Sequence, residues 1–148
     1  MEKFFEKMPK RGIFDLKIFR SGILIEEIHD DNLIVDGAKD QMAHLLIGET
    51  EGRNINRIAF GTNGIEPEPS DTAITDPFIK NIGVIFTLPK SGRAVFEWRL
   101  LETENNGMAI MEFGLLTADG TLFARRSRQN PIHKASDISL EGSWTIIF

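Results

Sequence analysis

The residues that could do chemistry in this chain are few and scattered. The three histidines, His29, His44 and His133, have no second histidine at the spacing of a metal site, and the chain contains no cysteine. Zinc coordination and thiol nucleophiles both depend on such residues. We therefore expect no metal-binding residue among the histidines and no disulfide framework.

Two other short motifs resemble ligand sites without completing one. Asp30, Asp31 and Asp36 could surround calcium, but the glycine and the final glutamate of an EF-hand loop are missing. The stretch GTNG at 61–64 lacks the Lys-Ser/Thr of a phosphate-binding loop and opens no periodic helix. Turn chemistry accounts for both motifs, so no cofactor is expected.

Catalysis and ligand binding have one set of candidates each. Glu97 and Glu112 lie on neighbouring predicted strands and could form a carboxylate pair, but nothing in the sequence predicts a cleft between them. We therefore expect no enzyme and no catalytic residue. The alternative is a small ligand- or carbohydrate-binding β module, in which Trp98 and Trp144 would be the aromatic platforms, although their strand phases favour the core.

Length and charge restrict the partners. The 148 residues suffice for one domain, and we expect an N-terminal arm at 1–12 followed by a single β-rich domain at 13–148. The net charge of −5 and the single short basic cluster at 125–128 argue against nucleic acid as a partner. No apolar run approaches the roughly 20 residues that span a bilayer, so no membrane partner is expected.

The central element is the stretch 111–126, in which Asp119-Gly120 separates two apolar runs. Asp-Gly favours a two-residue hairpin turn, and that turn would place Leu115 opposite Ala124 and Leu116 opposite Phe123. Such a ribbon is apolar on both faces and belongs in the middle of a sheet or beneath a second layer. Gly114 predicts a bulge or a close backbone approach.

The remaining pattern predicts a mainly β fold, an antiparallel β-sandwich or open barrel built of hairpins with one short α-helix at about 37–47. The helix would begin after the N-cap Asp36 and end at Gly48. Residues 30–32 read as a turn, and 62–77 as a long proline-rich loop with one helical turn near 71–75. Alternating apolar residues predict further strands at 13–20, 23–29, 57–61, 82–88, 94–101 and 138–148.

Large side chains on these strands supply the expected core, and other apolar residues are left over for contacts. The expected core aromatics are Phe86, Phe96, Trp98, Phe113, Phe123, Trp144 and Phe148. Surplus apolar residues in the arm, the proline loop and the central hairpin predict self-association or docking. The partner-contact candidates are Phe4, Phe5, Asn63, Gly64, Ile65, Asp119 and Gly120.

Three segments in this order resemble a family of bacteriophage and prophage tail or baseplate-associated structural proteins. They are NLIVDGAK at 32–39 with its helix, IAFGTNG at 58–64 followed by Pro67 or Pro69 and DTA at 71–73, and MEFGLL at 111–116 with ADGTLFAR at 118–125. The ending, with Pro131-Ile132 and WTI at 144–146, is also similar. The similarity extends over most of the chain from about Gly22 onward.

The resemblance implies a virion structural protein that assembles through contacts with other tail or baseplate proteins and with copies of itself. It implies no catalytic residues. The expected location is the bacterial cytoplasm during assembly, and then the virion or a phage-tail-like particle. The expected partners are therefore other proteins of the particle, with a homo-oligomer as one form of contact.

Overall fold

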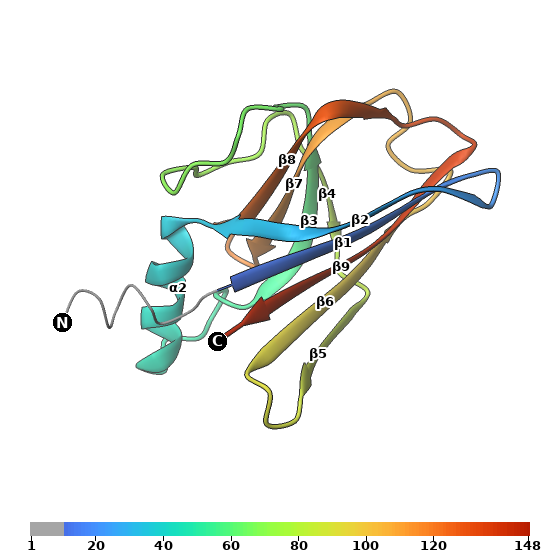
Figure 1. Ribbon diagram of the computed structural model, residues 1–148. Helices are drawn as coiled ribbons and strands as arrows, with labels where there is room; N and C mark the ends of the chain where they lie inside the picture. The colour runs from blue at the N-terminus through green and yellow to red at the C-terminus, as the bar shows by residue number, and fades with distance from the viewer. Residues whose placement is uncertain (1–10) are drawn as a thin grey trace.

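The computed structural model describes residues 11–148, which form one curled antiparallel sheet with a single helix at one end (Figure 1). The predicted mainly β class is confirmed. The helix is α2 (Asp36–Leu46), and the strands are β1 (Arg11–Arg20), β2 (Ile23–Ile34), β3 (Ile55–Gly61), β4 (Phe78–Asn81), β5 (Val84–Leu88), β6 (Arg93–Leu100), β7 (Ala109–Thr117), β8 (Leu122–His133) and β9 (Ile138–Ile147).

The sheet curls into a half-barrel whose two halves are joined by strand β2. The strand order is β4-β3-β7-β8-β2-β1-β9-β6-β5. Strand β2 pairs along β1 through most of its length, but Leu33 and Ile34 pair with β8 instead. Strands β4 and β5 are the two edges, although only Ile82 and Gly83 separate them in the chain.

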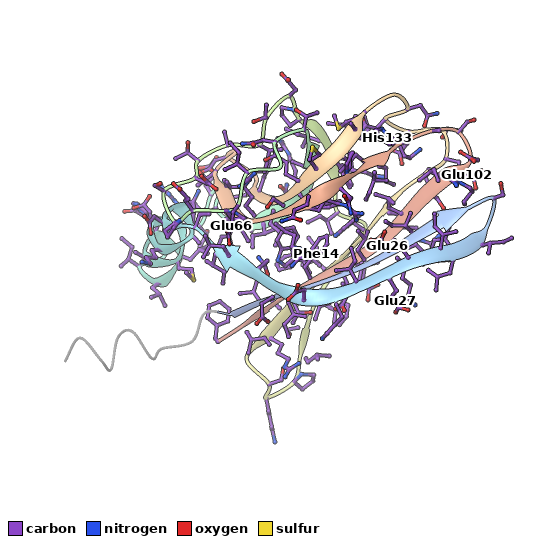
Figure 2. All side chains as sticks on the ribbon, turned by 45° about the horizontal axis from the view of Figure 1, so that its top comes forward. Phe14, Glu26, Glu27, Glu66, Glu102 and His133 are labelled. Carbon is purple, nitrogen blue, oxygen red and sulfur yellow. The ribbon has the colours of Figure 1, made fainter. Side chains whose placement is uncertain are left out.

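The core lies between the two halves of the curled sheet and is centred on Phe14, which Figure 2 labels in the interior. Its ring centroid lies 4.9 Å from that of Phe113 and 5.0 Å from that of Trp144. Phe60 and Trp98 continue the cluster with centroids 5.2 Å apart. Burial of each such side chain contributes about 1.5–3 kcal/mol, so this aromatic cluster is a major stabilising element.

A glycine in the last strand makes room for one of these rings. Gly142 on β9 pairs with Trp98 on β6, and a β-carbon at position 142 would overlap the indole. The ring therefore lies directly on the β9 backbone. The absence of a side chain at Gly142 thus allows a ring from β6 to pack against the backbone of the neighbouring strand β9.

Several predicted boundaries are wrong. Residues 30–32 continue strand β2 and do not form a turn, because they pair with Gly12, Ile13 and Phe14 of β1. Asp36 is the first helical residue, and the N-cap is Val35, which has no side-chain capping bond. The predicted C-terminal glycine is correct, since Gly48 follows the helix with φ of +87°. No helical turn forms at 71–75.

The central hairpin has a different turn from the predicted one. Leu115 pairs with Ala124 as expected, but Leu116 pairs with Leu122 because the register shifts between Leu115 and Leu116. Thr117 N–H donates to the carbonyl of Thr121, and Gly120 alone in the turn has positive φ, at +89°. These features fit a three-residue turn that ends in a glycine bulge, so the two-residue register is wrong.

Two predicted core aromatics lie at the surface. Phe96, Trp98, Phe113, Phe123 and Trp144 are buried as predicted. Phe86 is 37% exposed and Phe148 is 56% exposed. Phe86 lies on the edge strand β5, and Phe148 follows the last residue of β9, so neither has a second layer to cover it.

Candidate interaction surface

The long loop 62–77 is fixed to the sheet by a buried ion pair. Arg125 on β8 and Glu112 on β7 are 2% and 0% exposed, and Arg125 Nε lies 3.0 Å from Glu112 Oε1. The other Glu112 oxygen accepts the backbone N–H groups of Asn63 at 2.6 Å and Thr75 at 3.2 Å. One carboxylate thus holds both ends of the loop.

The arginine of this pair continues into the loop. Its Nη1 donates to Asp71 Oδ2 at 3.0 Å, and its Nη2 donates to the carbonyl of Asn63 at 2.8 Å. Ile74 lies against Gly114, whose missing side chain allows the loop to approach the sheet closely. Gly114 pairs with Ala59 and Arg125 without a register shift, so the predicted bulge does not form, and the close approach at this position is made by side chains and not by another backbone segment.

The three predicted contact residues in the loop, Asn63, Gly64 and Ile65, therefore differ in how much they expose to a partner. Asn63 uses both backbone groups for anchoring, and its side-chain oxygen accepts the N–H of Ile65. Gly64 faces the side chain of Met111 and the carbonyl of Arg128. Ile65 is 70% exposed, so it is a large apolar side chain that the loop offers to solvent.

The tip of the β7–β8 hairpin is fixed to helix α2 by a polar network. Gln41, which is 1% exposed, donates to Asp119 at 2.8–2.9 Å and to Thr117 Oγ1 at 3.2 Å. The Thr117 hydroxyl also donates to Asp119. The hydrogen bonds from Thr117 and then Gln41 lower the pKa of Asp119, so this candidate contact residue is an anion held by its own chain.

The same network extends to the connection after the helix. Arg53 Nη1 donates to Gln41 Oε1 at 2.8 Å, and Asp119 N–H donates to the carbonyl of Gly52 at 2.7 Å. Gly120 is exposed at the tip with open space around its α-carbon. The loop and the tip both lie at the helix end of the molecule (Figure 1), since Asp36 N–H donates to the carbonyl of Pro69 in the loop and Gln41 of the helix donates to Asp119 at the tip.

The basic cluster at 125–128 is neutralised within the chain. Arg126 Nη1 lies 3.1 Å from Asp30 Oδ2, with its guanidinium 5.9 Å from the Phe14 ring centroid, and Arg128 Nη1 lies 3.2 Å from Glu26 Oε2. These arginines line an open cleft of about 790 Å³ where β2 and β8 diverge. Glu66 and Glu26 also line it, the first toward the helix end and the second toward the β1–β2 hairpin (Figure 2).

The edge strand β5 also departs from the predicted core. Four of its five side chains are apolar, and its backbone pairs with β6 on one side. The exposed fractions are 49% for Val84, 49% for Ile85, 37% for Phe86 and 43% for Leu88. The strand is therefore apolar on both faces at an open sheet edge, which is a template for pairing with another strand.

A second apolar group lies at the opposite end from the helix. Ile23, Leu24 and Ile25 follow the β1–β2 turn and are 69%, 44% and 51% exposed. Close to this end, Lys134 is 2% exposed and donates to the carbonyls of Glu102 and Ala135 and to Asn106 Oδ1. Burial lowers the pKa of Lys134, whose ammonium fixes the neighbouring loops.

The sequence candidates for chemistry are not brought together. Glu97 is exposed on β6, whereas Glu112 is buried on β7 and paired with Arg125, so the hypothetical carboxylate pair does not form. Trp98 and Trp144 are 3% and 0% exposed, so both indoles are core side chains, as their strand phases predicted. Within residues 11–148, no group of three or more acidic or histidine side chains is arranged to hold a metal ion.

Two of the candidates cannot be placed. Phe4 and Phe5 lie outside the residues that the structure describes. In the described part of the chain, no helix has the length and apolar character needed to cross a membrane.

Comparison with known proteins identified no relative. No family model matches the chain, and no curated protein or solved structure matches it.

The anchoring residues were missed by sequence reasoning, although one signal was present. Within the predicted hairpin, Glu112 interrupts one apolar run and Arg125 directly follows the other, so the two paired strands carry charges of opposite sign. Buried charges are usually paired, so opposite charges next to apolar runs on paired strands indicate an internal ion pair. The exposure of β5 had no comparable signal, because an apolar edge strand and an apolar core strand have the same composition.

Proposed function

We propose that this chain is a structural component of a phage-like tail or baseplate and acts by docking to other tail proteins or to copies of itself. The observation that supports it best is the apolar edge strand β5, whose side chains are exposed on both faces. Burial of apolar area is the main driving force of protein association. The assignment to a tail particle rests on the resemblance of the segments at 32–39, 58–64 and 111–116.

The mode of contact follows from the chemistry of the edge. Strand β5 carries no charged side chain and no proline, which are the usual devices that block pairing at a sheet edge. A partner strand would gain main-chain hydrogen bonds along β5 and would cover Ile85 and Phe86. Ile65 and the Ile23–Ile25 group are separate apolar sites for further subunits.

The anchoring of the loop 62–77 is compatible with this role. An assembly protein must present its contact surface in one conformation, since ordering a loop on binding weakens the complex. The Glu112–Arg125 pair holds the loop before any partner arrives. Ile65 is thereby presented on a fixed backbone.

The decisive experiment examines particles rather than the isolated chain. Tail-like particles are purified from an induced lysogenic host that carries either the native gene or the Ile85→Lys variant. We expect the native chain in the particle fraction and loss of the variant from it. The control is Ser136→Lys, an exposed substitution away from β5, which should still assemble. Absence of the native chain from purified particles would contradict the proposal.

A further inference from the structure

A small apolar hollow lies at the helix end of the half-barrel, apart from the edge strand. Its volume is about 160 Å³, and six side chains form most of its wall: Met42, Leu45, Phe96, Phe123, Ile146 and Phe148. The helix contributes one wall, and the C-terminal end of the chain contributes another. Phe148 is 56% exposed there, so the hollow leaves apolar surface in contact with solvent.

The first ten residues of the chain join the described structure beside this hollow. Strand β1 begins at Arg11, which pairs with Ile147, the residue between two that line the hollow. An extended chain spans at most about 3.5 Å per residue, so Phe5 can be no more than roughly 20 Å from Arg11. Phe4 is one residue further, and both aromatic residues are therefore within reach of the hollow.

We propose that the Phe4–Phe5 pair of the same chain docks here and that one of its two rings fills the hollow. The volume supports a single ring, because an apolar cavity of about 150 Å³ accommodates benzene. The chemistry also agrees, since the wall is almost entirely apolar and the arm places two phenylalanines in succession.

The same chain is the favoured source of the ring. A segment tethered at Arg11 has an effective concentration in the millimolar range at a site within its reach. A second copy would need to reach such a concentration in solution. This inference is independent of the proposed tail role: it removes one of the two rings from the surface available to partners and leaves β5 available.

Methionine methyl groups provide a local test. Met42 lines the hollow, whereas Met108 contacts Asn105 and Met111 faces Gly64. In the full chain labelled with ¹³C at methionine methyls, we expect the Met42 methyl to show a nuclear Overhauser effect to a phenylalanine ring in addition to those from Phe96, Phe123 and Phe148, which line the same hollow. The Phe4→Ala/Phe5→Ala variant should lose only the additional effect, keep those from the three lining rings and shift the Met42 resonance. The Met108 and Met111 resonances should stay in place, which shows that the variant is folded.

A matched substitution and a mixed sample complete the test. Glu6→Ala changes the same segment without removing a ring, so its Met42 resonance should remain at the native position. Trypsin cleavage after Lys7 and Lys10 should be several-fold faster in the double phenylalanine variant than in the native chain. An unchanged Met42 resonance in the double variant would overturn the inference. The mixed sample contains chains labelled at the methionine methyls and chains labelled at the phenylalanine rings. An additional ring-to-Met42 effect seen only between these two kinds of chain would also overturn the inference, because the ring would then belong to a neighbouring copy.

Discussion

The buried ion pair under the loop and the apolar edge strand depart in opposite ways from the usual distribution of side chains. At the loop, Glu112 and Arg125 place two charges where the surroundings are apolar. At β5, Ile85 and Phe86 place apolar side chains where the surroundings are water. The first departure is compensated inside the chain, since the described hydrogen bonds use both Glu112 oxygens and three arginine nitrogens.

The buried ion pair and the edge strand β5 differ in where their partners lie, and this difference distinguishes a structural role from an interaction role. A buried charge with all its partners in the same subunit fixes that subunit's own conformation. An exposed apolar strand with pairing on one side gains stability only from something outside the described residues. Unusual side-chain placement is therefore informative about function only after the partners within the chain have been identified.

The largest effect expected from this comparison is at Arg125. Arg125→Met leaves the Glu112 carboxylate buried without its cation, and we expect the free energy of unfolding to fall by about 3–5 kcal/mol. Urea denaturation followed by tryptophan fluorescence measures it. Arg128→Met on the same strand is the control, because its partner Glu26 is 45% exposed and the pair should contribute about 0–1 kcal/mol. Equal losses in the two variants would contradict the special role of the buried pair.

The helix contact should give an intermediate effect. Gln41→Ala removes the donor to Thr117 and Asp119 and the acceptor of Arg53, so we expect a loss of about 1–3 kcal/mol by the same measurement. Lys39→Ala on the same helix alters only a surface ion pair with Asp36 and should change stability by less than about 0.5 kcal/mol. A neutral Gln41→Ala would show that the polar network does not hold the helix.

Acid should weaken the same contact. The folded-state pKa of Asp119 lies below that of the unfolded chain, so its contribution is present at neutral pH and is lost as the pH falls below about 4. Thermal unfolding of the native chain and of Asp119→Asn between neutral and acid pH measures the difference. We expect the melting temperatures of the two proteins to converge toward acid pH. A constant difference at all pH values would exclude this carboxylate as the cause.

The smallest effect on stability is expected at the edge strand. Ile85→Lys places a charge on a side chain that is already 49% exposed, so the free energy of unfolding should change by no more than about 0.5 kcal/mol. The same variant should be the one that fails to assemble. A loss of more than 2 kcal/mol would place Ile85 in the core and would remove the contrast between the two regions.

The fold class could be predicted because it depends on local periodicity. Alternation located β6 and β9 to within a residue or two, and the glycine after α2 marked its end. The wrong predictions concern strands whose formation depends on pairing with residues distant in the sequence. Strand β4 was missed because its four residues follow a proline-rich loop and carry no alternation of their own. Residues 30–32 have turn composition, but pairing with β1 keeps them extended.

The candidate contacts were predicted less well, for a related reason. Ile65 was recognised as a surplus apolar residue because the loop around it contains prolines and glycine, and it is exposed. Asp119 was recognised by its turn chemistry, but the helix that binds it lies 78 residues earlier in the chain. Which strand becomes an edge depends on the whole strand order, so the exposure of Phe86 could not be read from its own neighbours.

The contact between Gly142 and Trp98 has a consequence for divergent sequences. The indole occupies the volume that any side chain at position 142 would need, so neither position can change alone without repacking. We expect homologous chains to vary in a coupled manner here, with glycine at this point of the last strand wherever the facing residue is tryptophan. Where the facing residue is small, a larger substituent becomes admissible, so the pair provides a signature for recognising distant homologues.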